Sequence, residues 1–513
     1  MMIFQKIKEI FCQTWASVAP QKHRICCIGM AVSLMLAVIS CGIGWLVALR
    51  NVANLNIMLF CFPFLLLYCL FFCLDRFADR FLLMTFVGVV FVFLMGRPIL
   101  NLKMGKMWYR HLDPDGMVFA LTAVSLSLLC LCLGTWLMER YLKKKQSVCQ
   151  PITAVPKKQG KEDFQLAALL IYGGTMAFFL LGELDKLLFM RGREYEEFFL
   201  SYSSSLPSIV STFAAMMPLA LCAYLATMPE KRMAFCALAL YVISAAPQFL
   251  IGIRNPIVLN VLLALLYYYY RDRYGDRQKW YGKLEKGAIL LAAPGGAAAL
   301  ALIDFLRSGD KVAVSGLFSA ITDLFYKQGV SFNVLCKGYA VLDRLPGPDR
   351  NFTFGPFIDY FQQGRLGQAL LGTMPLPDGN SVLRAWYGHN LSHSLSFLIN
   401  KKYLEGAGSG SSYILELYCD YGWAGIVIGS LLLGALLAWF VYGFRKNWLV
   451  RTLILVCLTD IFFIPRAEAT GWLLFLVQPH IWIVVLGCVV GGKLLAALRI
   501  RERIGHLLRK RKK

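Results

Sequence analysis

The 513-residue chain is 58% hydrophobic and only 16% charged, and its formal net charge is +23 at pH 7. Soluble domains carry about 25% charged residues, so this composition excludes an ordinary soluble protein and favours a membrane protein. The positive charge alone could suggest nucleic-acid binding. However, the basic residues cluster beside apolar runs, which is typical of membrane topology and of contacts with anionic lipids.

Long apolar runs predict an all-α polytopic membrane protein with about twelve transmembrane helices, because a helix needs about 20 apolar residues to cross a bilayer. The predicted spans are 25–49, 57–74, 81–95, 117–137, 164–181, 209–228, 233–251, 257–270, 287–303, 423–442, 453–464 and 473–490. The first run has no small-residue cleavage site, so we expect a signal anchor. Pro465 and Pro479 interrupt the last pair, whose bounds are the least defined.

Lys and Arg in the loops predict that both termini lie in the cytoplasm, since basic clusters mark the inner side. The inner clusters are 139–145, 157–161, 229–232, 271–286, 444–451 and 499–513. The predicted organisation is therefore membrane helices 1–9 with short loops (1–303), a large extracytoplasmic loop (304–422), membrane helices 10–12 (423–498) and a basic cytoplasmic tail (499–513).

The large outer loop between the ninth and tenth spans holds most of the polar chemistry. Its amphipathic pieces predict short helices over the membrane, and long ordered loops are often functional. Cys336 and Cys419 fall in this loop, where a disulfide between them is one possibility. Most other cysteines lie in apolar runs and are expected to pack as small hydrophobes.

Two outer turns carry arginines suited to a phosphate. Arg254 lies in the sequence GIRNP, and Arg466 lies in FIPRAEAT together with Glu468. Arginine grips phosphate through two parallel hydrogen bonds, although an interfacial arginine that contacts head groups is the alternative. Glu468 could orient the phosphate or act as a base, or it could form a local ion pair. Asp460 is an intramembrane acid, a functional candidate or a helix–helix contact.

The sequence GHNLSHSL supplies His389, Asn390 and His393. On a helix the two histidines would share a face, a spacing that can hold zinc but is weak evidence without the protease glutamate. We therefore expect no metal. An imidazole as general base or phosphate donor fits better, because its pKa lies near working pH.

Further acidic and basic residues lie at the outer ends of other predicted spans. Glu416 and Asp420 are four residues apart and would lie on one helix face at the mouth of a span, where they could take part in chemistry. The alternative is that these acids only complement the dipole at the start of the helix. The small residues and serines of 408–412 precede this helix and offer N–H groups to an anion. Glu183, Asp185, Arg191 and Arg193 follow the fifth span and could line the same outer cavity as the residues above.

Three stretches resemble the O-antigen polysaccharide polymerase (Wzy) family, the oligosaccharide repeat-unit polymerases. They are 193–210 with 225–232, then 252–273, and finally 408–434 with PRAEAT at 465–470. GHN also resembles the His–Asn segment of O-antigen ligases. Arg344 and Gly355 match the Arg-x10-Gly spacing described for such polymerases, but no second copy of that motif is evident.

The resemblance implies a membrane-embedded glycosyltransferase without cofactors. It would transfer a growing chain from undecaprenyl diphosphate to a new lipid-linked repeat unit at the outer face of the bacterial cytoplasmic membrane. The product would be O-antigen, capsule or exopolysaccharide, and a chain-length regulator and a flippase are the expected partners, with no nucleic acid. The site prediction assigns catalysis to His389, Glu416 and Glu468. It assigns diphosphate binding to Arg254, Arg466, Arg344 and Arg191.

Other functions fit the same topology. An O-antigen ligase would share the chemistry and differ in its acceptor. A flippase or another transporter would usually show internal repeats and broken helices at the midplane. The long outer loop and the lack of repeats count against this alternative. A structural partner of the polysaccharide machinery is a further alternative.

Overall fold

The computed structural model describes residues 2–48, 55–105, 112–146, 161–193, 195–274, 279–283, 285–287, 322, 325–346, 350–377 and 379–498. Over these ranges the chain forms helices and no strand, which confirms the predicted all-α class. Ten helical segments within them are long and apolar enough to cross a membrane, and each corresponds to one predicted span.

The two remaining predicted spans have different outcomes. The span 257–270 lies in α13 (Asn255–Tyr274), which is helical. Four consecutive tyrosines followed by charged residues lower its hydropathy, so α13 is not among the ten candidates. The span 287–303 lies outside the described residues except for its first position. The number twelve therefore remains a prediction.

The prolines of the last two spans mark boundaries. Helix α22 (Trp448–Asp460) continues into the 3-10 helix η5 (Ile461–Arg466), which contains Pro465. Helix α23 (Pro479–Ala497) begins at Pro479, since proline fits the first turn of a helix, where its missing N–H costs nothing. The predicted span 473–490 was wrong at its start, where a separate 3-10 helix, η6 (Gly471–Leu476), forms.

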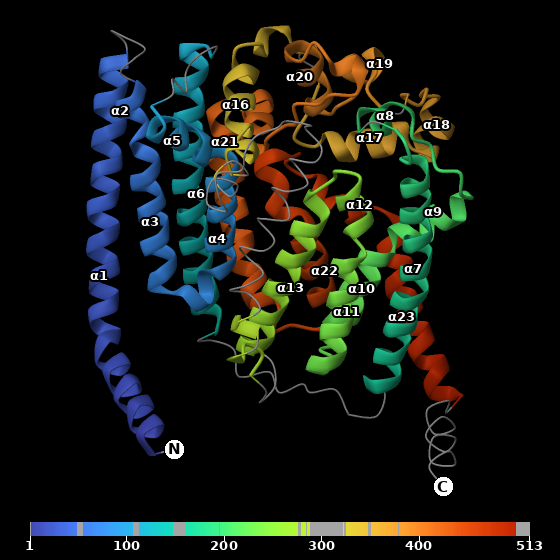
Figure 1. Cartoon of the computed structure of the whole chain (residues 1–513), viewed down its shortest axis with the longest axis horizontal. Helices are drawn as coiled ribbons and strands as arrows, with labels where there is room; N and C mark the ends of the chain where they lie inside the picture. Colours follow the sequence, from blue (N-terminus) through green and yellow to red (C-terminus); the bar gives the residue numbers. More distant parts are fainter. Residues whose placement is uncertain are drawn as a thin grey trace. The chain divides into compact units, whose positions relative to one another are not determined.

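The chain divides into two compact units, and unit 1 comprises residues 1–145, 326–343 and 417–441. Its helices are α1 (Met2–Ala48), α2 (Leu55–Leu59), α3 (Cys61–Asp75), α4 (Phe77–Val90), the π-helix η2 (Phe91–Met95), α5 (Gly96–Lys103), α6 (Pro114–Gln146), α16 (Ser331–Tyr339) and most of α21 (Tyr413–Gly443). Helix α1 packs along α3 (Figure 1). Neither Cys336 nor Cys419 takes part in a disulfide, so the possible bridge between them is not formed.

Helices α6 and α21 approach each other closely within unit 1. A Cβ atom added to Gly134 would lie 2.0 Å from the Leu431 carbonyl oxygen, and one added to Gly434 would lie 2.1 Å from that of Leu131. Glycine at both positions therefore permits backbone contact, as small residues do between membrane helices. Helix α21 itself kinks at Gly422 (φ 61°, ψ −150°), immediately before the predicted start of the tenth span.

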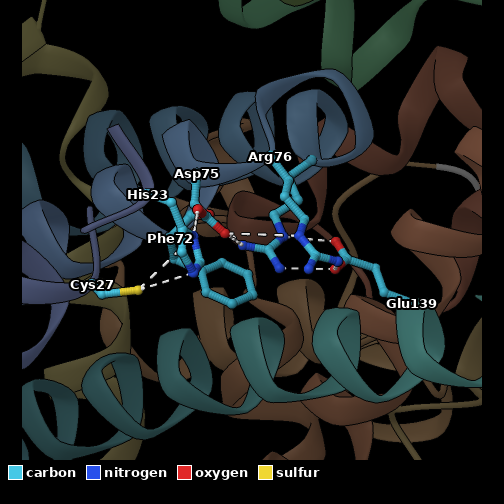
Figure 2. A network of polar contacts seen from close by, with 7 residues as sticks. His23, Cys27, Phe72, Asp75, Arg76 and Glu139 are labelled. Atoms are coloured by element: carbon cyan, nitrogen blue, oxygen red, sulfur yellow. Dashed lines mark hydrogen bonds and ion pairs between the residues drawn. The ribbon is translucent and has the colours of Figure 1, made fainter. Parts of the chain in front are cut away.

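An ionic network with a buried centre joins four helices of unit 1 (Figure 2). Arg80 in α4 donates from Nε and Nη2 to the two oxygens of Glu139 in α6, at 2.7 and 2.8 Å. Both side chains are at most 3% exposed. Asp75 at the end of α3 lies 3.7 Å from Arg80 and also contacts His23 of α1 at 2.5 Å. Residues 75–80 follow the second predicted span and Glu139 follows the fourth. Both are therefore expected on the same side of the membrane, and their contact in the network agrees with this.

Unit 2 comprises residues 146–325, 344–416 and 442–513. Its further helices are α7 (Lys161–Phe189), α8 (Tyr195–Ser201), α9 (Ser208–Ala215), α10 (Met217–Ala226), α11 (Lys231–Ile243), α12 (Ala246–Leu250), α17 (Gly355–Gln363), α18 (Arg365–Leu371), α19 (Val382–Tyr387), α20 (Leu391–Ile399) and the 3-10 helix η4 (Tyr403–Glu405). The short helices α17 to α20 lie at one end of the long helices of this unit (Figure 1). Short helices α16 and α20 do form in the amphipathic pieces of the large loop, as predicted.

Candidate active site

The connection between η5 and η6, residues 466–470, is fixed against the start of α21 by Glu416. This carboxylate lies in the first turn of α21 and is fully buried. Ser411 Oγ donates to its Oε1 at 2.7 Å, and the backbone N–H of Ala469 donates to its Oε2 at 2.7 Å. Because the protein itself occupies both oxygens, Glu416 is placed to position the 466–470 connection.

The same connection is tied to α20 through Asn390. The Asn390 Oδ1 atom caps α20 by accepting from the N–H groups of Ser392 and His393, at 2.9 and 3.4 Å. In this orientation the side-chain amide nitrogen of Asn390 points away from α20 and donates to Glu468 Oε1. Thr470 Oγ1 donates to the Thr353 carbonyl oxygen at 2.5 Å. Residues 353, 390 and 416, far apart in sequence, therefore all contact the 466–470 connection or its end.

His389 is held by an aspartate that lies 30 positions earlier in the chain. Asp359 of α17 accepts hydrogen bonds from the backbone N–H of His389, at 3.1 Å to each oxygen, and lies 3.0 Å from Nδ1 of the ring. A proton on Nδ1 leaves Nε2 as the acceptor for a substrate proton. At Gly355, a Cβ atom would lie 1.9 Å from the His389 carbonyl oxygen, so only glycine allows α17 to begin here.

The carboxyl of Glu468 binds its proton more tightly than an ordinary glutamate. Burial is the main cause of its raised pKa, and the negative charge of Asp359 adds to it, while the hydrogen bond from Asn390 opposes the shift. A carboxyl with a raised pKa is suited to acid–base work near neutral pH. Asp359 thus connects the two predicted catalytic groups, His389 and Glu468.

His393 has a different role from His389. Its Nδ1 pairs with the Tyr403 hydroxyl at 2.9 Å, and burial together with the nearby Arg384 lowers its pKa to about 4. It is therefore neutral and structural at working pH. The two histidines do not lie on one helix, because α20 begins at Leu391, after His389.

The four arginines that were predicted to bind the diphosphate lie in different parts of the structure. Arg466 ends η5 and lies two residues before Glu468. Arg254 is half-buried in the turn between α12 and α13, next to Asn255. Arg344, at the end of a 3-10 turn, and Arg191, after α7, are exposed, and neither side chain makes a hydrogen bond or ion pair with the described part of the chain. The structure thus brings the connection bearing Arg466 to the histidine group, but not Arg344 or Arg191.

The predicted acids after the fifth span are occupied by nearby groups. Asp185 accepts hydrogen bonds from Ser205 Oγ at 2.5 Å and Tyr202 Oη at 2.9 Å, so it holds the turn after α8. Glu183 is buried and pairs with Lys186 at 2.7 Å. These contacts assign a structural role to Asp185.

Sequence reasoning missed two side chains beside His389. Asp359 is the only acid of the mostly apolar α17, and Arg350 donates to the carbonyl oxygen of Tyr387. Arg350 lies within the Arg-x10-Gly spacing, and Asp359 lies just after it. An isolated acid in an amphipathic loop helix was the available signal for Asp359. For Arg350 the signal was its proximity to that motif.

Comparison with known proteins adds one finding. The model of a protein family described as O-antigen polysaccharide polymerase Wzy matches residues 29–497. No curated protein sequence and no solved structure matches the chain. The family match covers nearly the whole chain and includes every residue of the group around His389, Glu416 and Glu468.

Proposed function

The chain belongs to the O-antigen polysaccharide polymerase Wzy family, and we propose that it joins undecaprenyl-diphosphate-linked oligosaccharides on the outer face of the cytoplasmic membrane. The observation that carries the site assignment is the convergence on residues 466–470. His389 with Asp359, Glu468, and Arg466 lie on or beside this connection, at the end of α22. An acid–base pair and a cation are the groups that glycosyl transfer from a lipid diphosphate requires.

The proposed reaction forms one glycosidic bond and breaks one glycosyl-phosphate bond. An acceptor hydroxyl oxygen of the new repeat unit attacks the anomeric carbon of the growing chain. The bond from that carbon to the diphosphate oxygen breaks, and undecaprenyl diphosphate leaves with the electron pair. The proton of the acceptor hydroxyl passes to a base of the protein.

His389 is the base in this proposal. Asp359 fixes the ring with a proton on Nδ1 and stabilises the imidazolium that forms when Nε2 takes the acceptor proton. Glu468, in its ionised form, orients the acceptor hydroxyl. Glu416 is a positioning residue in this proposal, since both of its carboxylate oxygens accept hydrogen bonds from the protein.

Arginine binds the leaving diphosphate in this proposal. Arg466 directly follows Pro465 at the end of a 3-10 helix, and Arg254 lies in another turn of unit 2. A planar guanidinium can form two parallel hydrogen bonds with phosphate oxygens and remains charged at all working pH values. Both features stabilise the negative charge that develops as the lipid diphosphate departs.

Glycan length in living cells tests the function. In a deletion strain that expresses Arg466→Ala or His389→Ala, we expect surface glycan with single repeat units, while the wild-type gene restores long chains. Lys401→Ala, an exposed cation of the same loop, is the matched control and should give long chains. Immunoblots of the membrane fraction verify equal expression. Long chains in both site variants would reject the site, and absence of surface glycan in the deletion strain would indicate a flippase or an earlier step.

Accessibility of the large loop tests the outer-face assignment. An epitope inserted after Met374, whose side chain is 86% exposed, should be reached by antibody in spheroplasts without detergent. Binding only after the membrane is permeabilised would place the loop in the cytoplasm and reject the assignment.

A further inference from the structure

A cavity of about 220 Å³ lies within unit 2, among α7, α10, α11, α12, α13 and α22. Liquid water occupies about 30 Å³ per molecule, so the cavity has the volume of roughly seven waters. This is more than one ion requires and is the scale of a single sugar ring. Its polar wall consists of Tyr241, Gln248, Asn255, Asn260, Thr459 and Asp460.

The polar wall mainly offers acceptor oxygens. Gln248 Nε2 donates to Glu183 Oε1 at 2.7 Å, and Asn260 Nδ2 donates to the Tyr241 carbonyl oxygen at 2.9 Å. These bonds fix both amides and leave their carbonyl oxygens as acceptors. Asp460 adds a carboxylate, one oxygen of which accepts from Thr459 at 2.9 Å. A ligand rich in hydroxyl or N–H donors fits this wall.

The remaining wall excludes other ligands of the reaction. Phe179, Met217 and Leu259 supply apolar surface, and none of the described residues that line the cavity is Lys or Arg. A diphosphate would meet an acid without a compensating cation. A lipid tail would leave the second oxygen of the carboxylate and the side-chain carbonyl oxygens of both amides unpaired, at a desolvation cost. A sugar ring matches both walls, because it presents C–H groups on its faces and hydroxyl donors at its edge.

The cavity is next to the cations proposed for the diphosphate. Asn255 directly follows Arg254, and Asp460 directly precedes η5, whose last residue is Arg466. A 3-10 helix rises about 2 Å per residue, so the six residues of η5 place Arg466 roughly 12 Å from Asp460 along the chain. A ligand in the cavity therefore contacts the residue that follows Arg254, and the length of η5 separates the cavity wall from Arg466.

We propose that this cavity binds the sugar ring that carries the diphosphate in the lipid-linked repeat unit. Asp460, Gln248 and Asn260 accept hydrogen bonds from its hydroxyl or N-acyl groups, and Phe179 lies on the apolar side. This proposal rests on the function proposed above and makes the cavity a determinant of which repeat units are accepted.

Direct binding tests the proposal with the full-length protein in nanodiscs. The probe is the repeat-unit oligosaccharide released by mild acid from lipid-linked units that accumulate in a deletion strain, followed by saturation-transfer NMR. Leu259→Trp fills the cavity and should abolish binding. Val258→Trp, on the same helix with a 48% exposed side chain, is the matched control and should bind as the wild type.

The isosteric variant Asp460→Asn keeps the test valid if Leu259→Trp fails to fold. Loss of a hydrogen bond to a charged group lowers affinity about tenfold or more. Unchanged oligosaccharide affinity in Asp460→Asn or in folded Leu259→Trp would overturn the proposal. So would a sodium-dependent thermal shift that Asp460→Asn removes while affinity stays constant, since the cavity would then hold a cation.

The outcomes separate this inference from the proposed function. If polymer depends on His389 but the cavity variants bind normally, only the cavity assignment fails. If the deletion strain still makes long chains, the proposed function fails, and the NMR result alone judges whether the cavity binds the oligosaccharide.

Discussion

The backbone N–H of Ala469 donates a 2.7 Å hydrogen bond to Oε2 of Glu416, across 53 positions of the chain. This contact joins two of the stretches that resemble the polymerase family, 408–434 and 465–470. It fixes the connection that bears Arg466 and Glu468 relative to the start of α21. Several consequences for variants derive from this geometry and from the network around it.

Glu416 variants distinguish positioning from catalysis. Glutamine can still accept from the Ala469 N–H through its oxygen and donate from its amide to Ser411, so Glu416→Gln should retain long chains. Glu416→Ala leaves the N–H of Ala469 without its partner in a buried site and should abolish elongation. Glycan gels and membrane immunoblots measure both. Equal loss of polymer in the two variants would mean that the charge itself is required.

Asp359→Asn should slow polymerisation roughly 10²–10⁴-fold, because an amide cannot stabilise the imidazolium of His389 and can favour the wrong ring tautomer. The rate is measured with purified enzyme and lipid-linked repeat units. Asp343→Asn, at an exposed acid earlier in the sequence of the same large loop, is the control and should leave the rate unchanged. A rate for Asp359→Asn within a few-fold of wild type would remove the His–Asp pair from the mechanism.

Asn390→Ser should move the acid limb of the pH–rate profile to higher pH. Serine still caps α20, since both side chains are good N-caps, but it lacks the amide that donates to Glu468. That hydrogen bond lowers the pKa of Glu468, so its loss raises the pKa further and a higher pH is needed to ionise the carboxyl. Asn400→Ser is the control. An unshifted acid limb would show that Glu468 need not be ionised.

The raised pKa of Glu468 also predicts how the stability of the folded protein changes with pH. Its folded-state pKa is raised above the ordinary 4.5, so the neutral form is favoured by folding. The resulting stabilisation is complete below pH 4.5 and is lost as pH rises through the folded pKa. Relative to Glu468→Gln, the wild type should therefore lose thermal stability as the pH rises above 4.5 and through the folded pKa. A pH-independent difference in melting temperature would contradict the raised pKa.

The buried pair of Arg80 and Glu139 gives a prediction for unit 1. Glu139→Ala leaves a guanidinium buried without its carboxylate partner and should lower the free energy of unfolding by about 3–5 kcal/mol. Arg76→Ala removes a side chain that is 40% exposed and 3.5 Å from Glu139, and should cost less than about 1 kcal/mol. Denaturant titration in mixed micelles measures both. Similar losses in the two variants would contradict the assignment of the buried pair.

The sequence predicted most of the helices because apolar length decides whether a segment can span a bilayer. Its errors have local causes. Pro479 starts α23 where the apolar run seemed interrupted, so the predicted last span began too early. The site was predictable where polar residues clustered in sequence, as in GHN and PRAEAT. Asp359 was missed because its partner His389 lies 30 positions away, and only the folded loop brings them together.

Polymer synthesis in proteoliposomes tests the central claim most directly. Purified wild-type protein should convert lipid-linked repeat units, isolated from a deletion strain, into longer glycans with release of undecaprenyl diphosphate. His389→Ala and Arg466→Ala should yield neither product, while Lys401→Ala should yield both. Wild-type product formation by the two site variants would contradict the role of the 466–470 connection and its histidine.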